Sequence, residues 1–347
     1  MTTQPEPVDP GPSAEPQTLP APYRTGWRTP RQHLLTQESP VILSVVIMLA
    51  ALASYYALYW RRLERFPDVF DFTNLVNAAL PLVIVALGQT VVVVVAGLDL
   101  SVGGVFAMAM AIAATKMLTA GDILPWSVVI LGVGLVAGLV NGLLVAYARL
   151  APILVTIATL SIFNGLAILI LPQPGGTIPQ ELTDLLTNTT APLGAVYIAL
   201  ALLAWFALRR SKLGVALWAV GNDEAAAIAN GINARRAKAT AYVISGLCAA
   251  MAGIFFAART TGGDASKGGY IILASIAAVF LGGANGLGGR ASFIGTAAGA
   301  IVLTLINNIL FFARVNSLYQ PTAEGAILIA AVLVGIGVGK LTRGRHG

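Results

Sequence analysis

Few side chains in the apolar segments of this chain could do chemistry, and Asp99 is the most conspicuous of them. It lies in GLDLSVGG, residues 97–104, and interrupts an apolar run of more than twenty residues. A carboxylate in such a run either acts on a gate or a cargo, or caps the helix that follows, with Ser101 as the rival cap. The spacing favours the structural role, because Gly97 and Gly103 permit a sharp turn and a close approach of helices.

Uncharged polar side chains form a second group of candidates, because hydroxyls and amides on apolar segments can line a path for a neutral, hydroxyl-rich solute. The amides Asn141, Asn307 and Asn308 are the stronger candidates, since an amide is costly to leave unpaired in lipid. Each side chain could instead make a hydrogen bond between helices, worth roughly 1 kcal/mol. The predicted path residues are Asn141, Thr156, Thr159, Ser161, Asn164, Thr304, Asn307 and Asn308.

Two stretches of small residues interrupt the apolar pattern, and both are predicted to be helix turns or gates. The second stretch is GGANGLGGR, residues 282–290, about 185 residues after the first, and NGLL (141–144) and NNIL (307–310) recur at loosely corresponding places. The pattern is compatible with an internal inverted repeat, in which paired interrupted helices indicate a transport path. The predicted turn or gate residues are Gly97, Asp99, Ser101, Gly103, Gly282 and Gly283.

Signals of an enzyme or of a nucleotide site are missing from the sequence. GIGVGK, residues 335–340, resembles the end of a phosphate-binding loop, but Val334 stands where the first glycine belongs and Leu341 where Ser or Thr belongs. GVGLVA (132–137) and GLGGRA (286–291) fit a dinucleotide pattern only loosely, outside any strand–helix–strand unit. We therefore predict a protein that is not an enzyme, without an ATP site, metal or cofactor of its own.

The elements that must position these residues are membrane-spanning helices. The 347 residues are 57% hydrophobic and only 10% charged, whereas a soluble domain carries roughly 25% charged residues. We predict an all-α polytopic membrane protein with about ten transmembrane helices, each needing roughly 20 apolar residues. The predicted spans are 40–60, 74–97, 101–119, 123–147, 150–171, 192–208, 240–258, 270–287, 291–313 and 321–340.

The distribution of Lys and Arg predicts the orientation of these spans. Residues 209–238 carry six basic and two acidic side chains and are predicted to be cytoplasmic, whereas the loop 172–191 has no Lys or Arg and is predicted to lie outside. Ten spans then place both termini in the cytoplasm. RRLER, residues 61–65, falls on the outer side and disagrees with the rule. The net charge of +6 is explained by this topology, so no nucleic-acid partner is predicted.

The stretch GNDEAAAIANGINARRAKA, residues 221–239, predicts a short cytoplasmic helix. Asn222 can cap its N-terminus, Asp223 and Glu224 suit the positive end of the helix dipole, and Asn230-Gly231 supplies a left-handed stop. About two turns of helix are marginal alone in water. The helix is therefore either a docking element for a cytoplasmic partner or an ordinary amphipathic helix in a loop.

The stretch resembles the cytoplasmic coupling loop of ABC importer permeases of the ribose-type sugar family. GLDLSVG (97–103), NGLLVA (141–146), PILVTIATLSIFNGLA (152–167) and IAAVFLGGANGLGGRASFIGTAAGA (276–300) resemble other parts of that family, over about residues 40–340. The family usually has a Ser-rich turn where this chain has Ala-Asn-Gly-Leu before Gly-Gly-Arg. The residues matching the coupling loop are Gly221, Asn222, Asp223, Glu224, Ala225, Ala226, Gly231, Arg235 and Arg236.

The resemblance implies a type II ABC importer-like permease subunit in a bacterial inner membrane. Two such subunits, expected to be identical copies in the lipid bilayer, would dock on two ABC ATPase subunits, and an extracytoplasmic substrate-binding protein would deliver a ribose-like pentose or a hexose. The implied domains are a disordered Pro-rich tail (1–39), a transmembrane permease domain (40–340) with its coupling loop (209–239), and a basic cytoplasmic tail (341–347).

Two other functions stay open from the sequence. One is an ABC permease for branched-chain amino acids, nucleosides or a signalling furanose. The other is a secondary transporter or channel that needs no ATPase. The near absence of acidic residues from the spans argues against a proton-coupled carrier, which usually places such residues within its spans.

Overall fold

The chain is built from α-helices, as the sequence predicts. It divides into an N-terminal unit, Met1–Gln37, and a main unit, Glu38–Gly347, and every contact described below lies within the main unit. No strand occurs in the part of the chain that the structure describes, apart from an isolated bridge between Gly175 and Gly263. The computed structural model describes residues 30–316, 319, 322, 325 and 326, with side chains from residue 41 onward.

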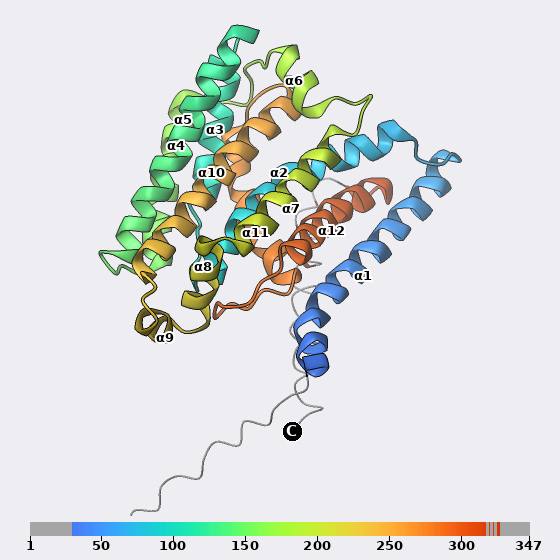
Figure 1. Cartoon of the computed structure of the whole chain (residues 1–347). Coiled ribbons are helices and arrows are strands. Elements are labelled where there is room, and N and C mark those ends of the chain that lie inside the picture. Colours follow the sequence, from blue (N-terminus) through green and yellow to red (C-terminus); the bar gives the residue numbers. More distant parts are fainter. Residues whose placement is uncertain (1–29, 317–318, 320–321, 323–324, 327–347) are drawn as a thin grey trace, which may run out of the picture. The chain divides into compact units, whose positions relative to one another are not determined.

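Seven of the described helices are long and apolar enough to cross a membrane, and α3 and the segment of η1 and α11 are shorter apolar helices. We refer below to the α9 end and the α6 end of the main unit, after the short helices that lie at its two ends (Figure 1). The helices are α1 (Pro30–Leu63), α2 (Val69–Val94), α3 (Val102–Lys116), α4 (Ala120–Ala146), α5 (Pro152–Ile170), α6 (Gln180–Thr187), α7 (Leu193–Arg210), α8 (Lys212–Asn222), α9 (Glu224–Ala229), α10 (Ala234–Thr260), η1 (Ala265–Lys267), α11 (Gly268–Leu281) and α12 (Phe293–Phe312).

Nine of the ten predicted spans coincide with helices, and the tenth, 321–340, falls almost wholly outside the described residues. Helix α1 begins at Pro30, ten residues before the predicted span at 40, so part of the predicted tail 1–39 is helical. Helix α6 was not predicted, because its eight residues are too few for a membrane span. Residues 1–29 lie outside the described part.

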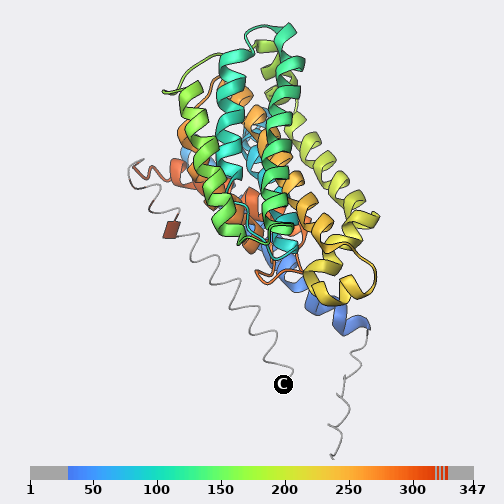
Figure 2. The ribbon, with the colours of Figure 1, turned by 90° about the vertical axis from the view of Figure 1, so that its left-hand side faces the viewer.

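Helices α2 and α10 form the core of the main unit. Within their most apolar windows, 89% of α2 and 72% of α10 are buried, against 11% of α1 and of α7. Helix α10 packs mainly against α4, α2 and α3, and α3 packs against α5 (Figure 2). A helix that is apolar all round must be buried or face lipid, so the exposed apolar surfaces of α1, α4, α5 and α7 are suited to lipid or to a partner chain.

Helices α4 and α10 touch backbone to backbone along a seam of glycines. Gly134, Gly138 and Gly142 are spaced four residues apart on α4 and therefore share one face. A Cβ on any of them would collide with the α10 backbone at Gly246, at Tyr242 and Val243, or at Ala239, respectively. Small residues at this spacing let membrane helices approach closely. We call this contact the α4–α10 seam.

The structure contains an inverted repeat, but its pairing differs from the one suggested by the sequence. The turn Asp99-Leu100-Ser101 recurs as Asp264-Ala265-Ser266, 165 residues later. In each turn the Asp Oδ1 accepts hydrogen bonds from the Ser N–H and from the Ser hydroxyl, the latter at 2.6 Å in both. The same shift of about 165 residues relates α2, α3 and α4 to α10, α11 and α12.

The equivalent glycines Gly103 and Gly268 meet where the two halves of the repeat cross. Each lacks room for a Cβ because the carbonyl of the other lies against it. The partner of residues 97–104 is therefore 262–269 and not the predicted 282–290, whereas the predicted match of 141–144 with 307–310 has the observed spacing.

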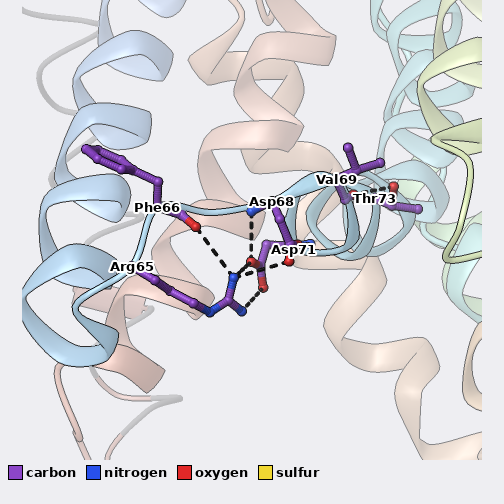
Figure 3. A network of polar contacts seen from close by, with 6 residues as sticks. All are labelled: Arg65, Phe66, Asp68, Val69, Asp71 and Thr73. Carbon is purple, nitrogen blue, oxygen red and sulfur yellow. Dashed lines mark hydrogen bonds and ion pairs between the residues drawn. The ribbon is translucent and has the colours of Figure 1, made fainter.

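The turn between α1 and α2 explains part of the charge pattern that disagrees with the predicted topology. The Arg65 guanidinium lies 3.3 Å from a carboxylate oxygen of Asp68 and 2.9 Å from one of Asp71 (Figure 3). Asp68 also caps α2, in a capping box with Asp71. One of the three arginines in RRLER is thus neutralised locally, so it carries less weight as a signal of orientation.

Candidate functional site

Helices α8 and α9 form the predicted cytoplasmic segment, and their caps follow from the local sequence. Ser211 accepts a hydrogen bond from the Gly214 N–H and caps α8. Asp223, and not the predicted Asn222, caps α9, since its carboxylate accepts from the Ala226 N–H at 2.9 Å. Asn222 is instead the last residue of α8, and its amide donates to the Trp218 carbonyl. Because α9 begins after Asp223, it has only six residues.

Helix α9 ends at the predicted left-handed stop and is held to α10 by one ion pair. Gly231 has φ 80°, and the Ile232 N–H returns to the Ala227 carbonyl at 3.0 Å. Glu224 pairs with Lys238 of α10. Ala227 is buried, while its neighbour Ile228 is 56% exposed. An exposed apolar side chain on so short a helix is suited to contact with a partner.

A groove of about 1070 Å³ runs beside α9. It is lined by the end of α8, α9, the turn between α4 and α5, the first turns of α10, and Val95 and Ala96 at the end of α2. Among the predicted coupling residues, Gly221, Asn222, Asp223, Glu224, Gly231 and Arg235 line it. Ala225, Ala226 and Arg236 do not.

Three segments that are distant in the sequence meet next to α9: residues 94–96, Gly221, and residues 288–289. We call this contact the glycine joint. The Gly289 N–H donates to the Val94 carbonyl at 2.9 Å. A Cβ on Gly221 would overlap that same carbonyl and crowd the Gly289 nitrogen, and a Cβ on Gly288 would crowd Ala96 and Gly221. The joint therefore connects the end of α8, directly before α9, to the α2–α3 turn and to the loop between α11 and α12, with no space between the backbones.

Beside this joint, a chain of buried hydrogen bonds connects α3, α4 and α5. The Thr159 hydroxyl donates to Asn141 Oδ1 at 2.8 Å, and Asn141 Nδ2 donates to the Ser101 hydroxyl at 2.7 Å. That hydroxyl donates in turn to Asp99 Oδ1 at 2.6 Å. None of the four side chains is more than 7% exposed. Asp99 thus shapes the turn before α3, and the rival cap Ser101 makes no capping bond of its own.

Gln89 and Tyr242 hold the same turn from α2 and α10, and both were missed by the sequence analysis. When the Gln89 amide is oriented so that donors meet acceptors, it bonds both the N–H and the carbonyl of Asp99. Tyr242 Oη lies 3.5 Å from the Leu98 carbonyl and leaves no room for a side chain at Gly97. Their positions in long apolar helices gave no local signal of this role.

The predicted path residues do not converge on one place. Asn141, Thr156, Thr159 and Thr304 are buried inside the chain. Ser161 is exposed on α5, with its hydroxyl bonded to the Ile157 carbonyl of its own helix. Asn164 is half-buried on α5, and Asn307 and Asn308 are half-buried on α12.

The amides on α12 have a neighbour that the sequence analysis did not include. Asn307 Nδ2 donates to the phenol oxygen of Tyr270 on α11 at 2.9 Å, while Asn308 Nδ2 bonds the Thr304 carbonyl. Tyr270 is 41% exposed. Of the predicted gate residues, Gly282 packs against the α12 backbone at Gly295 and Thr296, and Gly283 takes φ 86°.

Comparison with known proteins identifies similar chains among bacterial transporters. Residues 72–337 match the family described as branched-chain amino acid transport system / permease component. The chain is 32% identical to the ribose import permease protein of Escherichia coli K12 over 312 residues, which cover 87% of this chain and 94% of that one. It is 31% identical to the galactofuranose transporter permease protein of the same organism over 93% of this chain and 94% of that one.

A third relative is a probable ABC transporter permease protein of Sinorhizobium fredii, 34% identical over 76% of this chain and 80% of that one. No solved structure matches the chain.

Proposed function

Since the chain belongs to the ABC importer permease family that is described as branched-chain amino acid transport system / permease component, we propose that it is the membrane subunit of an ATP-driven monosaccharide importer. The observation that carries this proposal is the α9 segment, with its groove and the glycine joint beneath it. A short helix exposed at one end of a transmembrane bundle suits a subunit that receives movement from a separate ATPase.

The partners follow from this role. Two copies of the chain in the inner membrane of a bacterium pair and dock on two ABC ATPase subunits through α9, so the α9 end faces the cytoplasm, as do both termini. A binding protein delivers the sugar at the α6 end. The chain itself has no ATP site, in keeping with its incomplete GIGVGK stretch, residues 335–340.

A sugar is favoured over a branched-chain amino acid as the cargo. Relatives of this chain are named as permeases for ribose, galactofuranose and D-allose. The polar side chains at the surfaces of α5, α11 and α12 are amides and hydroxyls, and these three helices carry no charged side chain. Hydrogen bonds without fixed charges suit a neutral, hydroxyl-rich solute, whereas the carboxylate and ammonium of an amino acid would need charged partners.

The proposed path runs along the half-buried amides. Asn164, Asn307, Asn308 and Ser161 reach the surface of the chain and could contact a sugar directly, together with Tyr270. Asn141, Thr156, Thr159 and Thr304 are buried inside the chain, so they would hold together the helices that form the path rather than contact the sugar. Gly282 and Gly283, at the end of α11, would let the path close there.

Reconstitution tests the proposal. The permease is purified with its ATPase and binding protein, placed in liposomes, and assayed for ATP hydrolysis and uptake with ribose, allose, galactose, leucine and adenosine. We expect a pentose or a hexose to stimulate both activities, and no uptake when the ATPase is omitted. Stimulation by leucine or adenosine alone would replace the sugar by another cargo, and uptake without the ATPase would overturn the importer itself.

A further inference from the structure

The charges that line the groove beside α9 are not balanced within the chain. Three cations and two carboxylates line it, which gives a net charge of +1. Glu224 is paired with Lys238 at 2.6 Å, and the Asp223 carboxylate accepts the capping hydrogen bond of α9. Two cations remain on the walls, Arg149 from the α4–α5 turn and Arg235 from the start of α10. Both are exposed, and neither guanidinium makes an ion pair or hydrogen bond with any residue that the structure describes.

The backbone at the end of α4 fixes the position of Arg149. Arg149 has φ 56°, in the left-handed region where Gly or Asn is the usual residue after a helix. The Leu150 N–H bonds back to the Leu144 carbonyl at 3.1 Å, so the conformation is built into the end of α4. A residue with a Cβ costs about 1 kcal/mol or more there.

We propose that this groove binds an acidic segment of the ATPase partner, whose Asp or Glu side chains pair with Arg149 and Arg235. The inference rests on the proposed function and adds the chemistry of the contact. Both arginines line the groove together with Val95 and Ala96, which the segment would also contact. Guanidinium groups bind carboxylates in a bidentate geometry, which fixes orientation as well as adding affinity.

The location of the groove favours a protein over a lipid as its occupant. The end of α4, the start of α10 and α9 lie at the same end of the main unit (Figure 1), and residues of all three line the groove. Val95 and Ala96 of the α2–α3 turn also line it, and this turn forms part of the glycine joint. A segment seated there would press on the same backbone that connects α9 to both halves of the repeat. Binding would then be coupled directly to the movement that the ATPase must transmit.

The test measures the affinity of the ATPase for the full-length permease in nanodiscs, with Arg149→Asn, Arg235→Glu and Lys212→Glu variants. Arg149→Asn suits the left-handed backbone, so it removes the charge without impairing folding. Lys212 is the control, because it is an exposed cation at the start of α8 that does not line the groove. We expect Arg149→Asn and Arg235→Glu each to weaken binding about tenfold at low salt and Lys212→Glu to leave it within twofold. Because such pairs are screened by salt, 0.5 M NaCl should bring wild type close to the two variants.

Each other outcome overturns the inference. Equal losses in all three variants would indicate general surface charge, and wild-type affinity in Arg149→Asn and Arg235→Glu would leave the arginines without a role. A loss that appears only in nanodiscs containing phosphatidylglycerol would make an anionic lipid the occupant. These results differ from a failure of the proposed function, in which the wild-type permease itself would bind no ATPase.

Discussion

At the scale of single residues, Asp99 organises the interior more than it presents a charge. Its Oδ1 accepts two hydrogen bonds from Ser101, whose hydroxyl accepts a third from Asn141. The carboxylate is therefore the terminal acceptor of a chain that begins at Thr159 on α5. A buried polar chain of this kind is costly to break at any member, because the groups left behind stay buried without partners.

We predict that Ser101→Ala destabilises the protein by about 1–3 kcal/mol, because Asp99 and Asn141 both lose a partner in a dry site. Thermal unfolding of the purified protein in detergent measures this change. Ser161→Ala is the control, since that hydroxyl is exposed and bonds only its own helix. Equal melting temperatures for Ser101→Ala and wild type would mean that the hydrogen-bond chain contributes nothing to stability.

At the scale of helices, sequence patterns predicted most of the elements and some of the site. Apolar runs predicted nine spans, because the length of such a run depends only on local composition. The stop at Gly231 was also local and was confirmed. The groove and the glycine joint could not be predicted, since Arg149, Gly221 and Gly289 come together only through tertiary packing. The sequence suggested the wrong partner for residues 97–104, because residues 282–290 are also rich in glycine. The correct match, D-x-S-x-G-G at 99–104 and 264–269, is too short to stand out.

The α4–α10 seam leads to a prediction about one helix. Gly138→Ala should disrupt folding or lower the melting temperature strongly, because its Cβ would overlap the Tyr242 carbonyl. Gly132→Ala on the same helix faces open space and should leave the melting temperature unchanged or slightly higher. Size-exclusion chromatography and thermal unfolding compare the two. Similar behaviour of both variants would show that the seam is not tightly packed in the membrane.

Helix α9 gives a second prediction at this scale. Glu224→Lys should leave folding of the membrane part intact but reduce sugar-stimulated ATP hydrolysis and uptake, because it places a like charge beside Lys238 and alters the face offered to the ATPase. The double variant Glu224→Lys with Lys238→Glu restores the internal pair. Recovery in the double variant would assign the effect to that pair alone, while wild-type uptake in Glu224→Lys contradicts a coupling role for α9.

At the scale of the whole molecule, the glycine joint is where movement of α9 would reach both halves of the repeat. Gly221→Ala should separate the three backbones, because its Cβ would overlap the Val94 carbonyl. We expect the complex with the ATPase to assemble and hydrolyse ATP at the basal rate, while the stimulation by binding protein and sugar falls at least tenfold.

The control for this prediction lies in the same loop. At Gly286 an added Cβ would meet only the Phe280 ring, at 3.4 Å, so Gly286→Ala should retain normal stimulation. Hydrogen exchange offers a check without mutation, since residues 95–101, 219–223 and 286–290 should change protection together when ATP binds. A change confined to 219–223 would mean that the joint does not transmit the movement.

The α4–α10 seam has a consequence for how such a transporter can open. Its two helices belong to opposite halves of the inverted repeat, so the seam fastens the halves to each other along their length. Backbones in direct contact cannot slide or tilt without first being pulled apart. We therefore expect little movement of the halves about one another inside one subunit. In a paired importer, alternating access would come from each subunit turning as a single rigid body against its neighbour, with the route for the cargo opening along the boundary between them.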